Sequence, residues 1–195
     1  MFNIIVTGFE PFGGSSTNAS WEAVKALPDT IGAYTVHKIL LPVEFNRAAE
    51  KLIALGRDID PCWILLVGEN GRASDIAIER FAHNLQYAEI PDNAGQKPQN
   101  RQCIGDGDLA LESRHPIFDQ LGAIRSEGIP AHISTTAGTY VCNDLFYQVM
   151  THYLIVPTRV GFIHVPRLKK DADDAGPFMA VEDITRALLA AIEVL

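Results

Sequence analysis

Short apolar runs alternate with amphipathic stretches along the whole chain. The runs with the length and composition of strands are residues 4–7, 35–41, 63–67, 132–135 and 160–165. The stretches with apolar residues three and four positions apart, which predict helices, are residues 19–27, 44–55, 116–127, 141–153 and 181–194. Residues 63–67 are apolar at every position, which is typical of a central parallel strand covered on both faces. The alternation predicts an α/β sandwich.

Local signals predict where two of these helices begin and end. Asn18 precedes the helix at 19–27 and can cap it, and Pro28 follows and cannot continue it. Gly56 follows the helix at 44–55 and predicts its end.

Three segments depart from the regular pattern. Residues 76–85 predict an irregular hairpin or a bulged strand. Residues 91–107 are mostly turn formers, and a loop of that length usually covers something functional or is disordered. Residues 166–178 predict a charged, flexible loop.

Length, composition and charge narrow the class of protein. The 195 residues, 47% of them hydrophobic and 21% charged, predict one globular domain spanning residues 1–195. The formal net charge of −8 disfavours binding to nucleic acid or to anionic membranes. No apolar run approaches the roughly 18 residues that span a bilayer, and Glu10 interrupts the N-terminal apolar stretch before it reaches the length of a signal peptide. Three cysteines are too few for a disulfide framework, so we expect a cytoplasmic protein.

Three glycine-rich or acidic stretches resemble ligand-binding motifs but lack essential residues. Residues 8–15 have the outline of a phosphate-binding loop with Gly14 where the lysine belongs. Residues 105–110 fit a degenerate dinucleotide motif without a preceding strand, and residues 171–182 mimic a calcium loop with Ala175 at a ligand position. No histidine or cysteine spacing suggests zinc. The sequence therefore predicts neither a metal nor an organic cofactor.

Cys142 is a candidate nucleophile. It follows a turn of small residues after the strand at 132–135 and lies near the start of the helix at 141–153. The unpaired N–H groups and the partial positive charge of a helix N-terminus stabilise a thiolate, and the same N–H groups can bind a developing oxyanion. The alternative is a buried, unreactive cysteine, which is our interpretation of Cys62 and Cys103.

His164 and Glu79 are the candidate partners of this thiol. His164 ends an apolar run just before Pro166, so its ring is expected at the carboxyl edge of the sheet, where α/β proteins build their sites. Glu79 is an acid within an apolar stretch, and its alternative role is an ion pair with Arg80 or a half-exposed strand position. A thiol, an imidazole and a carboxylate on three separate elements are the groups that activated-thiol catalysis requires.

Five blocks of sequence resemble one known family. They are VTGFEPFGG at 6–14 with NASWEAV at 18–24, ERFAHN at 79–84, IPDNAG at 90–95, TAGTYVCN at 136–143 and GFIHVP at 161–166. In order and spacing these blocks resemble the pyroglutamyl peptidase I (pyrrolidone-carboxylate peptidase) family of cysteine peptidases. The resemblance covers nearly the whole chain, and it implies an α/β/α sandwich with a twisted, mixed and mostly parallel sheet.

The resemblance also implies an activity and a set of site residues. The activity is removal of an N-terminal pyroglutamyl residue from peptides, without a cofactor, through a thioester intermediate, and the implied assembly is a homotetramer. Cys142 would be the nucleophile, His164 the proton carrier and Glu79 the group that orients the ring. The residues implied to contact the pyroglutamyl ring are Phe9, Phe12, Glu69, Ile90, Tyr140 and Val141. Ordinary core packing is the alternative role for the two phenylalanines.

Three charged residues depart from the family pattern and leave alternatives open. Glu69 stands where the family usually has glutamine, Glu89 where it has arginine, and Asp144 where it has histidine. An ionised Glu69 accepts hydrogen bonds and donates none, so it would suit the lactam N–H but not its carbonyl. The alternatives are a related thiol amidase for another small cyclic or N-blocked acyl group, and a catalytically silent protein that binds pyroglutamate.

Overall fold

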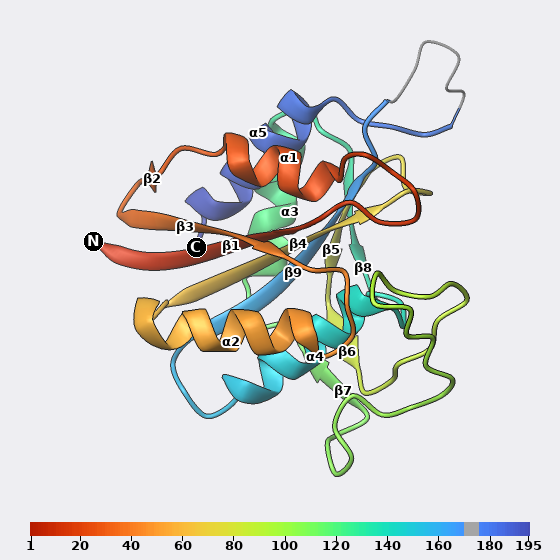
Figure 1. Cartoon of the computed structure of the whole chain (residues 1–195). Coiled ribbons are helices and arrows are strands. Elements are labelled where there is room, and N and C mark those ends of the chain that lie inside the picture. Colours follow the sequence, from red (N-terminus) through yellow and green to blue (C-terminus); the bar gives the residue numbers. More distant parts are fainter. Residues whose placement is uncertain (170–175) are drawn as a thin grey trace.

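A seven-stranded sheet forms the centre of the computed structural model, which describes residues 1–169 and 176–195 (Figure 1). The strands are β1 (Phe2–Phe9), β2 (Thr30–Ile31), β3 (Tyr34–Leu41), β4 (Trp63–Asn70), β5 (Ile76–Glu79), β6 (Phe81–His83), β7 (Ala110–Glu112), β8 (Ala131–Ser134) and β9 (Arg159–Pro166). The helices are α1 (Ala19–Ala26), α2 (Arg47–Ile59), α3 (Ile117–Ser126), α4 (Val141–His152) and α5 (Val181–Glu193).

The sheet is mixed and mostly parallel. Its strand order is β2-β3-β1-β4-β9-β5-β8, and β6 and β7 pair separately as a two-stranded sheet. Neighbouring strands run parallel except at two places, where β2 meets β3 and β5 meets β9. This architecture confirms the predicted α/β/α sandwich.

Helices cover both faces of the sheet, and each face has its own apolar cluster. The cluster beneath α1, α3 and α5 includes Leu65 and Val67 of β4. The cluster beneath α2 and α4 includes the alternate residues Ile64 and Leu66. Figure 1 shows α2 and α4 together on one side of the sheet and α1 and α5 on the other. The continuous apolar run in β4 thus serves two cores, as its sequence predicted.

All five predicted helices are present, and the predicted cap at Asn18 is confirmed. The Asn18 side chain accepts a hydrogen bond from the Ser20 N–H, and α1 ends two residues before Pro28. The prediction that Gly56 ends the second helix is wrong, because α2 continues to Ile59. A Cβ atom at Gly56 would clash with the Tyr153 hydroxyl, so this glycine allows α2 to pack closely on the end of α4.

The five predicted strands are also confirmed, and the irregular segments have a definite arrangement. Residues 76–85 form two strands: β5 joins the main sheet and β6 pairs with β7. The strand β7 and the short β2 were not predicted from the sequence. Residues 91–107 contain no helix or strand beyond an isolated bridge at Arg101.

The predicted charged loop at 166–178 falls partly on residues 170–175, outside the described part of the chain, as does the start of the calcium-like stretch. None of the helices in residues 1–169 and 176–195 has the length and apolarity needed to cross a membrane.

Candidate active site

The register of three adjacent strands brings His164 and Glu79 onto one face of the sheet. His164 lies opposite Gly68 in the parallel β4–β9 pair, and Glu79 lies opposite Phe162 in the antiparallel β5–β9 pair. Because Phe162 and His164 are two residues apart on β9, their side chains and that of Glu79 share a face. His164 Nδ1 lies 2.8 Å from Glu79 Oε1, and both residues are buried. This leaves Nε2 as the ring nitrogen available to another partner.

Cys142 reaches the same face from the start of α4. Val141 and Cys142 are the first two residues of the helix, and Tyr140 at the N-cap position makes no side-chain capping bond. The Cys142 sulfur and the His164 ring both face the backbone of Gly68, and the sulfur is close enough to raise the pKa of the ring. The first N–H groups of a helix have no partner within the helix, and they give this end a partial positive charge. The half-exposed Cys142 lies at this positive end of α4.

Gly68 leaves the space in which these groups meet. A Cβ atom at this position would lie 2.9 Å from Cys142 Sγ, 3.2 Å from His164 Cδ2 and 2.8 Å from Phe162 Cζ. Contacts this short force a neighbouring atom to move. Gly68 could not be predicted as a site residue, because a glycine near the end of an apolar strand carries no signal of what faces it.

The surroundings of His164 favour its charged form. Burial of the ring lowers its pKa, but hydrogen bonds to Cys142 and Glu79, together with the negative charges of both, outweigh burial and raise the pKa to about 10. An imidazolium held between a carboxylate and a sulfur favours a thiolate at that sulfur. The arrangement can therefore supply a nucleophile and a proton donor side by side.

Among the described residues, the other two thiols contact backbone carbonyls and no imidazole. Burial raises the pKa of Cys62. Burial and the neighbouring Asp144 raise the pKa of Cys103 to about 12. Both therefore remain protonated and unreactive at neutral pH.

Glu79 does not form the ion pair that the sequence analysis considered as its alternative role. Arg80 instead binds Glu112 on β7, with 2.8 Å between Nε and Oε1. Glu79 is 2% exposed, and its Oε2 has no hydrogen-bond partner among the described residues. Within the same residues, no three or more histidine, cysteine, aspartate or glutamate side chains are grouped so as to hold a metal ion.

Four of the six residues expected at the ring lie in one apolar cluster with Cys142. Phe9 and Val141 are buried there, and Phe12 and Tyr140 are partly buried against it. The rings of Phe12 and Tyr140 are 6.5 Å apart, and the Tyr140 hydroxyl donates to the Pro91 carbonyl at 3.0 Å. These residues surround the start of α4 with apolar and aromatic groups.

The other two, Ile90 and Glu69, lie differently. Ile90 is 49% exposed and lies outside this cluster. Glu69 follows Gly68 on β4, so its side chain points to the opposite face from His164. There its Oε2 accepts a hydrogen bond of 2.6 Å from the N–H of Ala19, at the start of α1. A carboxylate at a helix N-terminus is stabilised by the helix dipole.

Buried polar residues that the sequence analysis did not assign to the site hold the segments around it. Asn143 accepts from the His83 N–H and donates to the carbonyls of His83 and Leu85, so it fixes α4 to the segment after β6. Asp92 accepts from the N–H of Phe45 at 2.9 Å. The loop at 91–107 is therefore fastened to the site by specific hydrogen bonds.

Comparison with known proteins gives consistent relatives over the full chain. The family model described as pyroglutamyl peptidase matches residues 2–195. A pyrrolidone-carboxylate peptidase of Brevibacillus brevis is 42% identical over 199 residues, covering 99% of this chain and 92% of the relative. Pyrrolidone-carboxylate peptidase 1 of Caldanaerobacter subterraneus is 37% identical over 196 residues, covering 98% of this chain and 97% of the relative.

Solved structures show the same similarity in three dimensions. The crystal structure of pyroglutamyl peptidase I from Bacillus amyloliquefaciens superposes with a TM-score of 0.95 at 36% identity, covering 100% of this chain and 96% of that one. Pyrrolidone carboxyl peptidase from Thermococcus litoralis gives a TM-score of 0.93 at 34% identity, covering 100% and 93%. Identities above 30% over whole chains indicate common descent as well as a common fold.

Proposed function

The chain belongs to the pyroglutamyl peptidase family of cysteine peptidases, and from this premise we propose that Cys142, His164 and Glu79 perform its chemistry. The reaction is hydrolysis of the amide bond after an N-terminal pyroglutamyl residue. Residues 1–195 act as one peptidase domain. The observation that supports the assignment most strongly is the buried His164–Glu79 contact of 2.8 Å beside the Cys142 sulfur.

Acylation begins with the thiolate of Cys142. The sulfur attacks the pyroglutamyl carbonyl carbon, and the oxygen becomes an oxyanion that free N–H groups at the start of α4 can bind. The imidazolium of His164 then donates its Nε2 proton to the leaving amine as the C–N bond breaks. The products of this half-reaction are a thioester on Cys142 and a peptide shortened by one residue.

Deacylation uses the same groups in the opposite sense. Neutral His164 takes a proton from a water molecule that attacks the thioester, and the C–S bond breaks to return the thiolate and release pyroglutamate. Glu79 accepts a hydrogen bond from the Nδ1–H group of His164 throughout, which fixes the ring and stabilises its charged form.

The acyl site lies in the apolar cluster beside Cys142. Phe9, Phe12, Tyr140 and Val141 suit an uncharged lactam ring, because an apolar slot with few polar groups binds such a ring with little desolvation cost. Ile90 completes the rim from the exposed side. Glu69 contributes through its bond to Ala19, which fixes the start of α1 and hence the loop that carries Phe12.

Two broader features belong to the proposal. Self-association, as a homotetramer, is supported by exposed apolar side chains such as Phe2, Phe118 and Ile155, and light scattering measures it. A cytoplasmic location is supported by the three cysteines, none of which is in a disulfide.

The test is hydrolysis of a pyroglutamyl anilide by the pure protein and its Cys142→Ala variant. We expect release of the aniline by the wild type, none above background by Cys142→Ala, and normal release by the matched control Cys62→Ala. Undiminished hydrolysis by Cys142→Ala would refute the thiol mechanism. Faster turnover of other acyl anilides would favour the related amidase, and binding of pyroglutamate without any hydrolysis would favour the silent binding protein.

A further inference from the structure

A buried carboxylate two residues after Cys142 binds groups from three different segments. Asp144 lies in the first turn of α4 and is fully buried. Its Oδ2 accepts from the backbone N–H of Asn46 at 2.7 Å. Its Oδ1 accepts from Nε2 of Gln86 at 2.6 Å and from Nε2 of Gln148, one turn later in α4, at 2.7 Å. This carboxylate joins the start of α4 to the segment before α2 and to the segment after β6.

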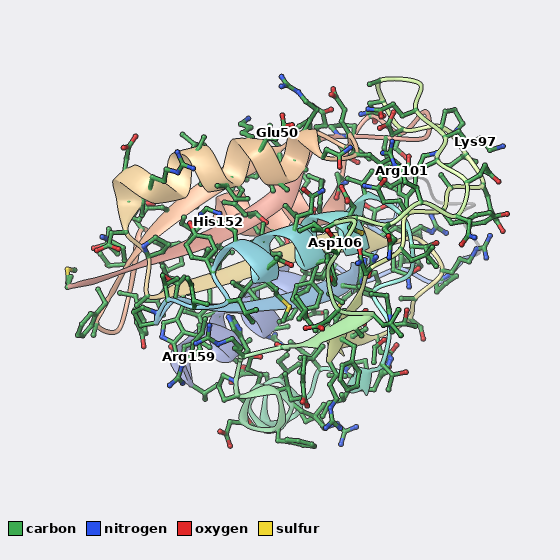
Figure 2. All side chains as sticks on the ribbon, turned by 90° about the horizontal axis from the view of Figure 1, so that it is seen from below. Glu50, Lys97, Arg101, Asp106, His152 and Arg159 are labelled. Atoms are coloured by element: carbon green, nitrogen blue, oxygen red, sulfur yellow. The ribbon has the colours of Figure 1, made fainter. Side chains whose placement is uncertain are left out.

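The charge of Asp144 is stabilised without a direct ion pair among the described residues. It lies in the first turn of α4, and its partner Asn46 is the N-cap of α2, so two positive helix ends meet at this carboxylate. Arg101 adds a more distant cation, because its Nε donates to Gln86 Oε1 at 2.6 Å. The Gln86 amide therefore lies between a cation and an anion, with its oxygen toward one and its nitrogen toward the other. Figure 2 shows Arg101 on the long loop, at one end of the face that α2 and α4 cover.

The turn that Asp144 holds also supports the aromatic wall of the site. Asn46 has a left-handed backbone, with φ of 65°, which is unusual for a residue other than glycine and needs fixed partners. Its neighbour Phe45 is bound through its own N–H to Asp92, so two buried carboxylates hold two consecutive N–H groups. The Phe45 ring packs edge-on against Tyr140, with 5.4 Å between ring centres. Tyr140 immediately precedes the helix that carries the nucleophile.

We propose that Asp144 is a positioning residue, whose carboxylate holds the first turn of α4, and with it Cys142, against the turn at residues 45–46. The inference rests on the proposed function, since it takes Cys142 as the nucleophile. Both oxygens of the side chain must act as acceptors, because three N–H groups donate to them. An asparagine offers one acceptor and one donor, so it must turn its NH₂ group toward at least one of these donors. The start of α4 then shifts relative to His164, and catalysis depends on that geometry.

The test compares Asp144→Asn with Asp119→Asn, which removes an exposed carboxylate from the first turn of α3. Reactive thiol is counted by titration with iodoacetamide, and kcat is expressed per titrated thiol. We expect Asp144→Asn to lower kcat at least tenfold while KM changes less than threefold, and Asp119→Asn to match the wild type. A kcat within twofold of the wild type would overturn the proposal. So would an effect confined to KM, or a loss that disappears when activity is expressed per titrated thiol.

A second variant decides the matter if Asp144→Asn does not fold. Gln148→Met removes one of the three donors to Asp144 from a half-buried position on the second turn of α4. We expect a loss of kcat of threefold or more per titrated thiol with KM within twofold, and an unchanged kcat would overturn the proposal. The proposed function fails separately, either if Cys142→Ala keeps its activity or if the wild type does not hydrolyse the pyroglutamyl anilide. If Cys142→Ala is inactive but Asp144→Asn or Gln148→Met has the kcat of the wild type, the positioning role of Asp144 is refuted and the proposed function stands.

Discussion

Adding one methyl group at Gly68 tests the geometry of the site without changing the chemistry of any reacting group. An alanine Cβ there would lie 2.9 Å from Cys142 Sγ and 3.2 Å from His164 Cδ2, whereas ordinary contact begins at 3.4 Å. The sulfur must therefore retreat by about half an ångström, and Phe162, at 2.8 Å, must move as well. Since a displacement of about 1 Å can cost a factor of roughly 100 in rate, we expect Gly68→Ala to lower kcat/KM by about ten- to a hundredfold.

The stability of the same variant should change much less than its activity. Overpacking in a core costs about 1–3 kcal/mol, and alanine regains about 0.5–1 kcal/mol over glycine in a strand. A net loss of about 1–2 kcal/mol lowers the melting temperature of a chain this size by roughly 2–8 °C. Circular dichroism at 25 °C should therefore show a folded protein.

The assay measures kcat/KM on a pyroglutamyl anilide together with the rate of Cys142 alkylation by iodoacetamide. The matched control is Gly122→Ala, because a Cβ at this exposed position in α3 meets no atom within 4 Å. Gly122→Ala should retain wild-type activity and gain a little stability from its better helix propensity. If Gly68→Ala kept its activity and its alkylation rate within twofold of the wild type, the sulfur and the ring could not meet over Gly68 as described.

Three further predictions follow from the buried titratable groups. The pKa of His164 is raised to about 10, so kcat/KM should fall above about pH 10 as the imidazolium loses its proton. Glu79→Gln should move this fall in activity to lower pH, because the carboxylate helps to raise the pKa of the ring. A fall at unchanged pH would contradict the role of Glu79. Burial lowers the pKa of His115 to about 4, so the unfolded chain binds the extra proton first and stability should fall by about 3 kcal/mol as pH drops from about 6.5 to about 4. The free energy of unfolding, measured with urea at several pH values, should depend less on pH in His115→Gln than in the wild type. The control His152→Gln, at an exposed residue, should show the pH dependence of the wild type. An equal pH dependence in all three proteins would contradict a lowered pKa of His115. Limited iodoacetamide at pH 7 should label Cys142 alone, because the raised pKa values of Cys62 and Cys103 keep those thiols protonated. Peptide mapping that found either of them labelled as fast as Cys142 would contradict the higher reactivity of Cys142.

Much of the fold could be predicted from the sequence because its signals are local. Periodicity of apolar residues located all five helices and five of the seven strands of the main sheet, and Asn18 marked a true helix start. The end of α2 was misplaced because Gly56 serves packing against Tyr153, a residue nearly a hundred positions away. The pairing of β6 with β7 escaped notice for a similar reason, since about 26 residues of loop separate the two short strands.

Some residues of the candidate site also have local sequence signals, and others do not. Cys142, His164 and Glu79 could be predicted because each is a titratable residue at a distinctive place in the sequence. Cys142 lies at a helix start, His164 near the end of an apolar strand, and Glu79 within an apolar stretch. Gly68 could not be recognised, because its importance lies in what a side chain would displace. Asp144 was visible only as an unusual residue, because the donors that give it a role come from segments remote in sequence.

Inactivation by the chloromethyl ketone of pyroglutamate tests the central claim most directly. This reagent carries the acyl group of the substrate and alkylates a nucleophile that lies at the scissile position. The account predicts that activity disappears at the same rate as one adduct forms, and that peptide mapping places the adduct on Cys142. Complete inactivation with Cys142 unmodified, or full modification of Cys142 with activity retained, would contradict it.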